Sequence, residues 1–403
     1  MLNRPLEQPG EADTTQLDKR KMTQGTAATS RSFGVVEDNE LRRRLGFITA
    51  IPQSVHRGSG CYVGIGTLAA GATSLGNRVE MITPAIQLAP FLAERYFFNQ
   101  ALRLRRGWNY DAIIGFDLDG FALDKRCRAP HIANIKGVLG DAVPFERGAT
   151  RASMALQARW EAEHARRADL VITTSEYCKN RLQELYGVNG SIAVVPELID
   201  LETWRQLFRA NPATKPEGEF TVLCVCRFYP RKRLTLLLQA AHLLRGQIPG
   251  LQIRVVGGGP EAASLLRMWR ELKLQPVVTW VGEVPRHELA REYNRADVFC
   301  LPSVQEGFGI VFLEAMAAGK PIVAARAAAV PEVVRHGVLV QPENAEALAY
   351  GIWRLWRDPN LRSAVRQQQC EDVEKYEMIA VTRRFLREIG RVTRPSTPSE
   401  PVT

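Results

Sequence analysis

Residues Val298–Ala325 read VFCLPSVQEGFGIVFLEAMAAGKPIVAA and contain two apolar runs of strand length with a helical run between them. The first run, 298–301, has the length and composition of a buried strand, and the run 310–318 has those of a helix. Gly319 stands where a left-handed residue commonly ends a helix, and a second strand is expected after Pro321. This order of strand, loop, helix and strand predicts a parallel α/β sheet.

Two carboxylates lie eight residues apart in this stretch, Glu306 in the loop and Glu314 in the helix. Ligands of parallel α/β sheets bind beyond the carboxyl ends of the strands. The first amides of a helix that starts after Gly309 lack intrahelical partners and favour an anion such as a phosphate. We therefore expect Glu306 beside an anion and Glu314 on a polyol such as ribose. Such a pair also occurs by chance about once in a chain of this size, so its context has to support it.

The length and composition indicate a two-domain globular protein. A chain of 403 residues exceeds one ordinary core and suggests domains of roughly 150 to 200 residues. Its 45% apolar and 24% charged residues are typical of soluble proteins. The seven cysteines have no metal or redox spacing, and neither a signal peptide nor a membrane-spanning run is recognisable. We expect a cytoplasmic protein.

The net charge of +10 favours anionic ligands or anionic surfaces. Nucleic acid is not expected as a partner, because zinc-finger spacing, RNA-binding aromatic signatures and heptads are all missing from the sequence. Residues 91–106 combine an apolar face with Arg103, Arg105 and Arg106. We expect a helix packed on the sheet with a solvated basic edge; the alternative is peripheral association of this helix with an anionic membrane.

The chain divides into segments of different composition. Residues 1–43 and 393–403 are poor in large apolar groups and are expected to be a disordered arm and tail. Strands alternate with helices without hairpin signals over 44–210 and again over 219–375, which predicts two parallel-sheet domains. The character of the chain changes after residue 201, and we place an interdomain linker at 211–218.

The glycines of the first domain partly match a dinucleotide-binding pattern. Gly58, Gly60 and Gly64 give G-x-G-x-x-x-G, and Glu80 follows about 20 residues later. The glycines do not follow the strand of 44–51 directly, however, and Glu80 falls in the middle of the next strand. The pattern is better interpreted as a general phosphate-binding glycine loop than as a dehydrogenase site.

A metal site is not predicted. Asp117 and Asp119 follow a buried strand, but no third ligand stands near them in the sequence. Acidic residues in loops are usually solvated.

Several motifs of the second half occur together in one known family. They are VCRFYPRKR (Val225–Arg233), VVGGGP (Val255–Pro260), VTWVGEVP (Val278–Pro285), ADVFCLPSVQEGFGIVFLEAMAAGKPIVA (Ala296–Ala324) and VPEVV (Val330–Val334). In order and spacing, this half resembles the retaining, nucleotide-sugar-dependent glycosyltransferases of family 4 (glycosyl transferases group 1). The first half is more loosely similar, through its glycine loop and ADLVITTSEYCKNRL (Ala168–Leu182).

The resemblance implies the GT-B fold. This α/β fold has two Rossmann-like, parallel-sheet domains that face each other across a cleft. The last helix, within residues 376–392, is expected to cross back and pack on the N-terminal domain. The two domains would then close over the donor and exclude water.

The resemblance also implies roles for residues around the donor diphosphate. Arg227 and Lys232 match the family's basic pair, which stabilises the charge that grows on the leaving diphosphate. Gly60 lies where a loop of the N-terminal domain faces the diphosphate, and Gly257 lies in the glycine turn of the donor domain. The family normally requires no metal.

The two carboxylates match the family's E-x7-E pair. Glu306 is expected near the transferred sugar and the acceptor, and Glu314 on the ribose hydroxyls. The backbone of Phe308, Gly309 and Ile310 is expected to contact sugar hydroxyls and phosphate. Retention of configuration would follow from attack on the same face, in which the leaving phosphate oxygen takes the acceptor proton.

Three departures from the family pattern concern the acceptor side and the hinge. Lys136-Gly137 stands where the family often has His-Gly, so Lys136 is our catalytic candidate at the sugar together with Glu306. Residues 196–200 read PELID in place of Pro-Asn-Gly-Ile-Asp. Ala328-Ala329 replaces the usual Gly-Gly. We expect a distinct acceptor.

The function expected from the resemblance is transfer of a sugar from a UDP-, GDP- or ADP-sugar to a glycan, lipid or small-molecule acceptor, with no further cofactor. Two alternatives remain open. One is a nucleotide-sugar epimerase or isomerase on the same fold, and the other is a catalytically inactive nucleotide-sugar-binding module.

Overall fold

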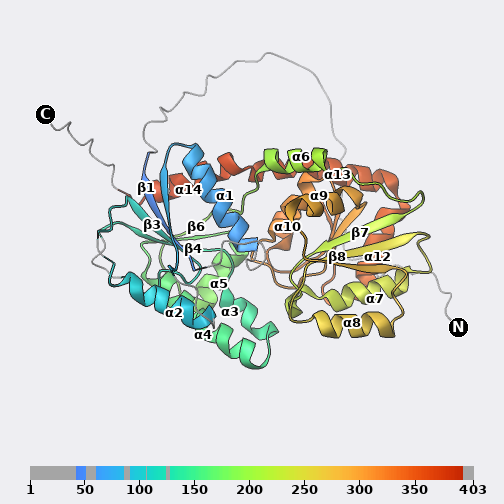
Figure 1. Cartoon of the computed structure of the whole chain (residues 1–403), viewed down its shortest axis with the longest axis horizontal. Coiled ribbons are helices and arrows are strands. Elements are labelled where there is room, and N and C mark those ends of the chain that lie inside the picture. The colour runs from blue at the N-terminus through green and yellow to red at the C-terminus, as the bar shows by residue number, and fades with distance from the viewer. Residues whose placement is uncertain (1–41, 51–59, 86–90, 106, 124–127, 394–403) are drawn as a thin grey trace, which may run out of the picture.

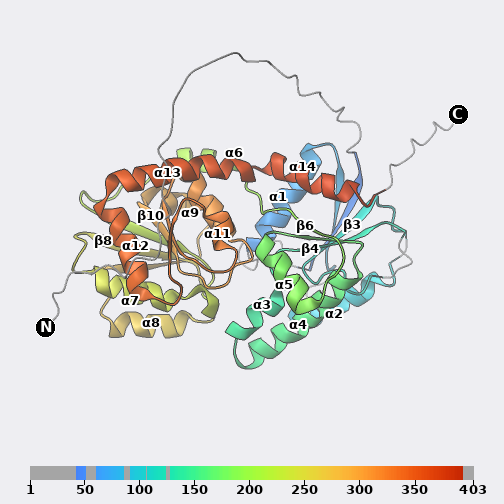
Figure 2. The same ribbon diagram turned by 180° about the vertical axis from the view of Figure 1, so that it is seen from behind.

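The computed structural model describes residues 42–50, 60–85, 91–105, 107–123 and 128–393, which form two α/β units (Figures 1 and 2). Each unit contains one six-stranded parallel sheet, as the alternation of strands and helices predicts. Nearly all of the predicted terminal arm and tail lie outside the described residues.

The first sheet has the strand order β2-β1-β3-β4-β5-β6. Its central strand β3 has the sequence AIIGF and is buried throughout, as expected for a parallel strand covered on both faces. The strands are β1 (Arg44–Ile48), β2 (Arg78–Ile82), β3 (Ala112–Phe116), β4 (His131–Ile135), β5 (Leu170–Thr173) and β6 (Ile192–Val194). The helices connecting them are α1 (Gly60–Ser74), α2 (Phe91–Leu102), α3 (Leu139–Ala142), α4 (Gly148–Arg167) and α5 (Glu176–Tyr186).

The second sheet has the order β12-β11-β10-β7-β8-β9. Its strands are β7 (Phe220–Val225), β8 (Leu251–Val256), β9 (Val278–Gly282), β10 (Val298–Leu301), β11 (Ile322–Ala325) and β12 (Val338–Val340). Its helices are α7 (Leu234–Leu244), α8 (Ala262–Glu271), α9 (Arg286–Arg295), α10 (Ile310–Ala317), α11 (Val330–Val333), α12 (Ala345–Arg357) and α13 (Pro359–Val373). The predicted strand, loop, helix and strand are therefore β10, α10 and β11.

The last helix returns to the first unit. Helix α13 ends at Val373, and α14 (Met378–Gly390) continues along the top of Figure 1 to lie beside α1. Phe385 and Ile389 of α14 are buried in the core of the first sheet, where Phe385 meets the ring of Phe47 edge-on. The predicted return of the last helix is confirmed.

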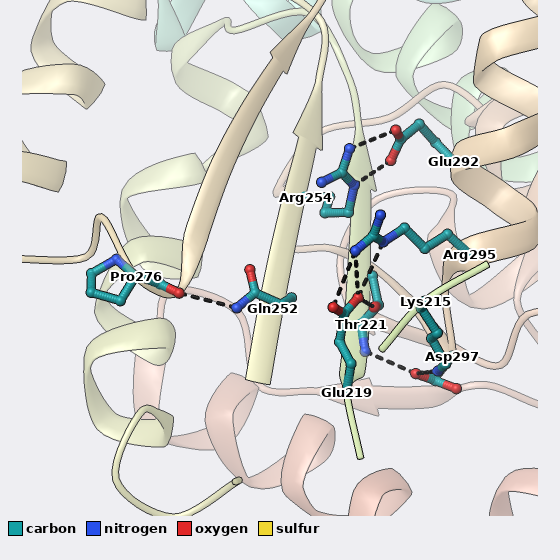
Figure 3. Close-up of polar contacts among 9 residues, drawn as sticks. All are labelled: Lys215, Glu219, Thr221, Gln252, Arg254, Pro276, Glu292, Arg295 and Asp297. Carbon is teal, nitrogen blue, oxygen red and sulfur yellow. Dashed lines mark hydrogen bonds and ion pairs between the residues drawn. The ribbon is translucent and has the colours of Figure 1, made fainter. Parts of the chain in front are cut away.

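The segment that joins the units is fastened to the second one. Residues 211–218, the proposed linker, follow helix α6 (Leu201–Ala210). Figure 3 shows Lys215 paired with Asp297, and Glu219 accepting three hydrogen bonds from the guanidinium of Arg295. The division of the chain at this segment stays a proposal, and these ion pairs support a firm attachment of its C-terminal end.

Helix α6 is absent from the sequence prediction. It packs against α9, and Leu201 and Trp204 are buried in the core of the second sheet. The ring of Trp204 stacks on Phe208 and meets Tyr293 edge-on.

The basic helix predicted for residues 91–106 is shorter than expected. Helix α2 ends at Leu102, and Arg103 and Arg105 follow it in turns. Arg105 turns back to pair with Glu80 and lies over the ring of Trp108. Arg106 lies outside the described residues. The prediction of a helix that continues through the basic cluster was therefore wrong at its C-terminal end.

Candidate functional site

The loop between β10 and α10 lies where the two units meet. Glu306 and Gly307 belong to this loop, and α10 begins directly after Gly309. Gly309 has a φ of 89°, and a side chain there would collide with the ring of Phe312, so glycine is required for the turn into the helix. The amide of Phe312 donates to the carbonyl of Gly309, whereas the amides of Ile310 and Val311 precede the first intrahelical acceptor and lie at the positive end of the helix dipole. We call residues 304–309 the donor loop.

The ammonium of Lys232 pairs with the carboxylate of Glu306, with 2.5 Å between Nζ and Oε1. Both side chains are largely buried. Lys232 ends a short 3-10 helix, and the preceding Arg231 carbonyl accepts a hydrogen bond from the amide of Val304. The basic loop and the donor loop, 74 residues apart in sequence, are thus joined at the predicted site.

Arg227 lies nearer the surface. Its guanidinium pairs with Glu283, and both side chains are about two-fifths exposed. Gly257, with a φ of 126°, packs against the carbonyl of Cys226 so closely that any side chain would clash with it. The glycine turn therefore brings the end of β8 against the residue that precedes Arg227.

Glu314 is buried in α10 and accepts a hydrogen bond from the hydroxyl of Tyr293, with 3.0 Å between the oxygens. Burial raises the pKa of Glu314 to about 7, and the Tyr293 hydroxyl opposes that rise. The tyrosine uses one carboxylate oxygen, Oε2. Glu314 is therefore held in one orientation and is close to its midpoint of ionisation at neutral pH.

Two further predicted residues border the donor loop. Phe308 is buried, and its ring meets Tyr376 edge-on at 5.5 Å between centroids. Its ring is therefore packed inside the protein, and the contact predicted between its backbone and a ligand stays a prediction. Ile310 is the first residue of α10. Gly60 is the first residue of α1, whereas Gly58 of the same glycine pattern lies outside the described residues.

Lys136 follows β4 and pairs with Glu197, with 2.9 Å between Nζ and Oε2. Its carbonyl lies against the donor loop, because a side chain on Gly307 would come within 2.8 Å of that oxygen. Lys136 is therefore adjacent to the loop that carries Glu306. Its ammonium, however, is bound to a carboxylate that the sequence analysis did not assign to the site.

The first unit holds the donor loop through the N-terminus of α5. The hydroxyls of Thr174 and Ser175 both donate to the carbonyl of Gly307, at 3.0 and 2.8 Å. Glu332 of α11 in turn accepts hydrogen bonds from the amides of Glu176 and Tyr177, at 2.8 and 2.7 Å. A carboxylate at a helix N-terminus is favourable because free amides and the helix dipole both attract it.

Asp119 is not available as a metal ligand. It is fully buried and paired with Arg95, and it also accepts a hydrogen bond from Asn99. Asp117 accepts a hydrogen bond from the Lys136 amide. In the described part of the chain no group of three or more His, Cys, Asp or Glu residues has a metal-binding arrangement.

The helices of the described residues include none that is long and apolar enough to cross a membrane.

Several residues of this region were missed by sequence reasoning. Tyr293, Glu197 and Ser175 contact predicted residues or the donor loop. Glu332 binds the N-terminus of α5, which carries Ser175. Ser175 and Glu332 lie within the family motifs ADLVITTSEYCKNRL and VPEVV, but neither motif indicates that the two segments meet. Glu197 lies in PELID, one of the departures from the family pattern, but that departure does not indicate Lys136 as its partner. For Tyr293 the sequence offers no signal beyond the residue type.

Two family models match the chain in succession. Residues 60–203 match Glycosyltransferase Family 4, and residues 208–371 match Glycosyl transferases group 1. Together they cover most of both α/β units.

Curated relatives match over about half of their length. The GDP-mannose-dependent alpha-(1-6)-phosphatidylinositol monomannoside mannosyltransferase of Mycobacterium tuberculosis is 32% identical over 208 residues, 47% of this chain and 53% of that protein. The D-inositol 3-phosphate glycosyltransferase of Nocardiopsis dassonvillei is 32% identical over 221 residues, 51% of this chain and 52% of that protein.

A solved structure supports the fold over almost the whole of its own length. The sucrose-phosphate synthase of Thermosynechococcus elongatus superposes with a TM-score of 0.71 at 22% identity, covering 87% of this chain and 99% of that one. At this identity the likeness concerns the fold alone. With both family models matched in order and the last helix returning to the first unit, the chain belongs to the family 4 glycosyltransferases (glycosyl transferases group 1) and has the GT-B fold.

Proposed function

We propose that the protein transfers a sugar, with retention of configuration, from a nucleotide diphospho-sugar to an acceptor hydroxyl. The observation that carries this proposal is the Lys232–Glu306 pair beside the free N-terminal amides of α10. It combines a cation, a carboxylate and a helix N-terminus, which suit a diphosphate and the sugar attached to it.

Arg227 and Lys232 are proposed to bind the diphosphate. Cleavage of the bond to the sugar leaves a nucleoside diphosphate, so negative charge grows on its oxygens during the reaction. Fixed cations stabilise that growing charge more than they stabilise the substrate, and this difference accelerates the reaction. Both cations are paired with glutamates, Glu283 and Glu306, so the incoming phosphates would share or replace these partners.

Glu314 is proposed to bind the ribose hydroxyls. Tyr293 uses Oε2 of its carboxylate, which leaves Oε1 as an acceptor for a diol. Phe308, Gly309 and Ile310 contribute backbone groups to the sugar and phosphate, and Gly257 and Gly60 line the diphosphate from the two units.

Glu306 and Lys136 are proposed to act at the transferred sugar. The leaving phosphate oxygen takes the proton of the acceptor hydroxyl on the same face of the sugar, so a carboxylate nucleophile is not needed. This mechanism also needs no metal ion, because Lys232, Arg227 and the helix N-terminus supply the positive charge.

The donor and acceptor classes remain those expected from sequence: a UDP-, GDP- or ADP-sugar, and a glycan, lipid or small molecule. GDP-mannose is the first donor to test, because one relative is named for its dependence on it. The names of the two relatives specify a phosphatidylinositol monomannoside and an inositol 3-phosphate. Both acceptors present a phosphorylated inositol.

A panel of labelled nucleotide sugars, with and without these acceptors and with EDTA, tests the proposal. Acceptor-dependent release of nucleoside diphosphate in EDTA, with a product of unchanged anomeric configuration, is expected. A changed sugar on an intact nucleotide would favour the epimerase alternative, and binding without turnover the inactive module. An inverted product would contradict the proposed mechanism.

We also propose that the first unit contacts an anionic membrane peripherally while the protein remains cytoplasmic. Phe91, Tyr96 and Phe97 on α2 and Leu156 on α4 are exposed, Phe97 by 59%. Helices α2 and α4 lie side by side in both views, and Tyr96 contacts Trp160 of α4 (Figures 1 and 2). Aromatic and aliphatic side chains at such a surface insert between lipid headgroups, while nearby arginines attract anionic lipid.

Sedimentation with vesicles tests this contact. We expect the protein to sediment with phosphatidylglycerol-containing vesicles at low salt. The Phe97→Ser change should weaken binding to these vesicles severalfold. Leu185→Ser on α5, where Leu185 is 43% exposed, is the matched control. If the unmodified protein does not sediment with the vesicles, or if both variants lose sedimentation equally, the proposed membrane contact is contradicted.

A further inference from the structure

The ion pair of Lys136 and Glu197 is the best-buried contact between opposite charges beside the donor loop in the described residues. The side chains are 3% and 7% exposed, and 2.9 Å separates Nζ from Oε2. Lys136 follows β4, and Glu197 lies between β6 and α6, 61 residues later. Burying two charges costs several kcal/mol per ion before their attraction offsets it. A pair in such a position therefore needs a reason other than stability.

The Lys136–Glu197 pair lies where three segments meet: helix α1, the donor loop and the segment that carries Asp117. Glu197 packs on α1, because a side chain on Gly64 would come within 2.6 Å of its Oε2. The backbone of Lys136 touches Gly307, the residue after Glu306. The amide of Lys136 also donates to Asp117, so the start of this segment is fixed from a second side.

The pair carries no net charge. Without Glu197 the ammonium would lose its direct partner and keep only the carboxylate of Asp117 as a nearby opposite charge, so it would attract an anionic group at the sugar end of the site more strongly. With Glu197 in place, the pair has no net charge and offers the N–H groups of Lys136 as donors and the carboxylate of Glu197 as an acceptor. These groups suit the hydroxyls of an uncharged sugar and do not favour a sugar that carries a carboxylate.

We infer that Glu197 is a positioning residue that acts through Lys136: it holds the ammonium in place and, by cancelling its charge, restricts the adjacent sugar site to uncharged sugars. This inference rests on the proposed function, since it requires the transferred sugar to lie beside the donor loop. It differs from the expectation that Lys136 acts at the sugar as a free cation.

A double-mutant cycle tests the inference. The variants are Glu197→Gln, Lys136→Met and the double variant, with Glu197→Asp as a charge-retaining change and exposed Glu202→Gln on α6 as the control. Each is assayed for kcat and KM with the neutral nucleotide hexose that the unmodified protein uses and with the corresponding nucleotide hexuronate. Affinity for the nucleoside diphosphate and thermal unfolding report on folding.

We expect Glu197→Gln to lower kcat with the neutral donor about tenfold or more, the effect of losing about 1.4 kcal/mol of transition-state stabilisation. It should shift the preference between the two donors toward the hexuronate. Glu197→Asp should lower kcat without changing the preference, because the charge remains. In the Lys136→Met background the Glu197→Gln change should lower kcat no further, because no ammonium remains to be positioned.

Equal losses from Glu197→Gln in both backgrounds would overturn the inference, because Glu197 would then act independently of Lys136. An unchanged kcat and donor preference in Glu197→Gln would overturn it as well. If Glu197→Gln does not fold, Glu197→Asp and the double variant decide. A shifted donor preference in Glu197→Asp contradicts the inference. A double variant that keeps both the preference for the neutral sugar and the full kcat contradicts it as well. Lack of turnover by the unmodified protein would instead contradict the proposed function.

Discussion

The hydroxyl of Ser175 in the first unit donates a hydrogen bond to the carbonyl of Gly307 in the second, with 2.8 Å between the oxygens. The two residues are 132 positions apart in the chain. Gly307 is flanked by Glu306, so this bond connects the N-terminus of α5 to the residue proposed to lie at the transferred sugar. The geometry of the donor loop thus depends on both units.

Ser175→Ala is expected to lower kcat about fivefold with little change in nucleoside diphosphate affinity, because one hydrogen bond contributes about 1 kcal/mol. Ser175 also caps α5 by accepting from the Cys178 amide, and loss of that cap costs about 1 kcal/mol of stability. Asn344→Ala, which removes the corresponding cap of α12, is the matched control. Steady-state kinetics of both variants separate the two effects: equal kcat values would show that the Gly307 contact does not orient the loop.

Binding of the nucleotide is expected to depend on pH through Glu314. Burial raises its pKa to about 7, and only the ionised carboxylate accepts hydrogen bonds from both ribose hydroxyls. Affinity should therefore fall as the pH is lowered from 8 to 6, by up to about tenfold for one group of this pKa. Titration calorimetry of nucleoside diphosphate across this range measures the effect.

Tyr293→Phe provides the control for that titration. The hydroxyl of Tyr293 lowers the pKa of Glu314 against the effect of burial, so its removal should move the midpoint of the affinity profile to higher pH. The phosphates titrate identically with both proteins and cancel in the comparison. A midpoint that stays in place would exclude Glu314 as the titrating group.

The first unit contains a histidine pair that should make stability depend on pH. Nδ1 of His164 lies 2.5 Å from the carbonyl of Asp117 and must donate to it, so Nε2 accepts from Nε2 of His131 at 2.9 Å. Burial lowers the pKa of His164 to about 4 and that of His131 well below its usual value. Both rings are therefore neutral when folded. Their contribution to stability is present above the unfolded pKa, near 6.5, and is lost as the pH falls toward 4.

Denaturant unfolding at pH 7.5 and pH 5 measures this loss. Burial raises the pKa of Asp117 to about 6 and that of Glu161 to about 8, and these acids oppose the histidines by favouring the folded state as the pH falls. The comparison must therefore be made with His164→Gln. This variant should be less stable at pH 7.5 and lose less stability between the two pH values; a loss equal to that of the unmodified protein would contradict the assignment.

The local elements of the second unit were predictable because periodicity and turn residues are local properties. β10 has the predicted bounds 298–301, and α10 ends one residue before the predicted end of the helix. Helix α6 was missed because its polar residues and the Asn211-Pro212 that follows suggested a loop, and its apolar face is stabilised only by contacts with α9 and the second core.

The partners of the site residues were not predictable in the same way. The sequence predicts a diphosphate site that includes Glu306, Lys232 and Arg227. The structure pairs Glu306 directly with Lys232. The pairing of Lys136 with Glu197 depends on which loops the strand order brings together, and no local pattern encodes that order. The same holds for Glu332 at the N-terminus of α5.

Calorimetric titration of GDP, UDP and ADP into the unmodified protein, Lys232→Ala and Glu314→Ala tests the proposed donor site most directly. Glu371→Ala, an exposed glutamate of α13, is the matched control. The expected result is that at least one nucleotide binds, that both site variants weaken it at least tenfold, about 1.4 kcal/mol, and that Glu371→Ala binds it as the unmodified protein does. Affinities in Lys232→Ala and Glu314→Ala equal to that of the control, with all proteins folded, would contradict a nucleotide-sugar site on the donor loop.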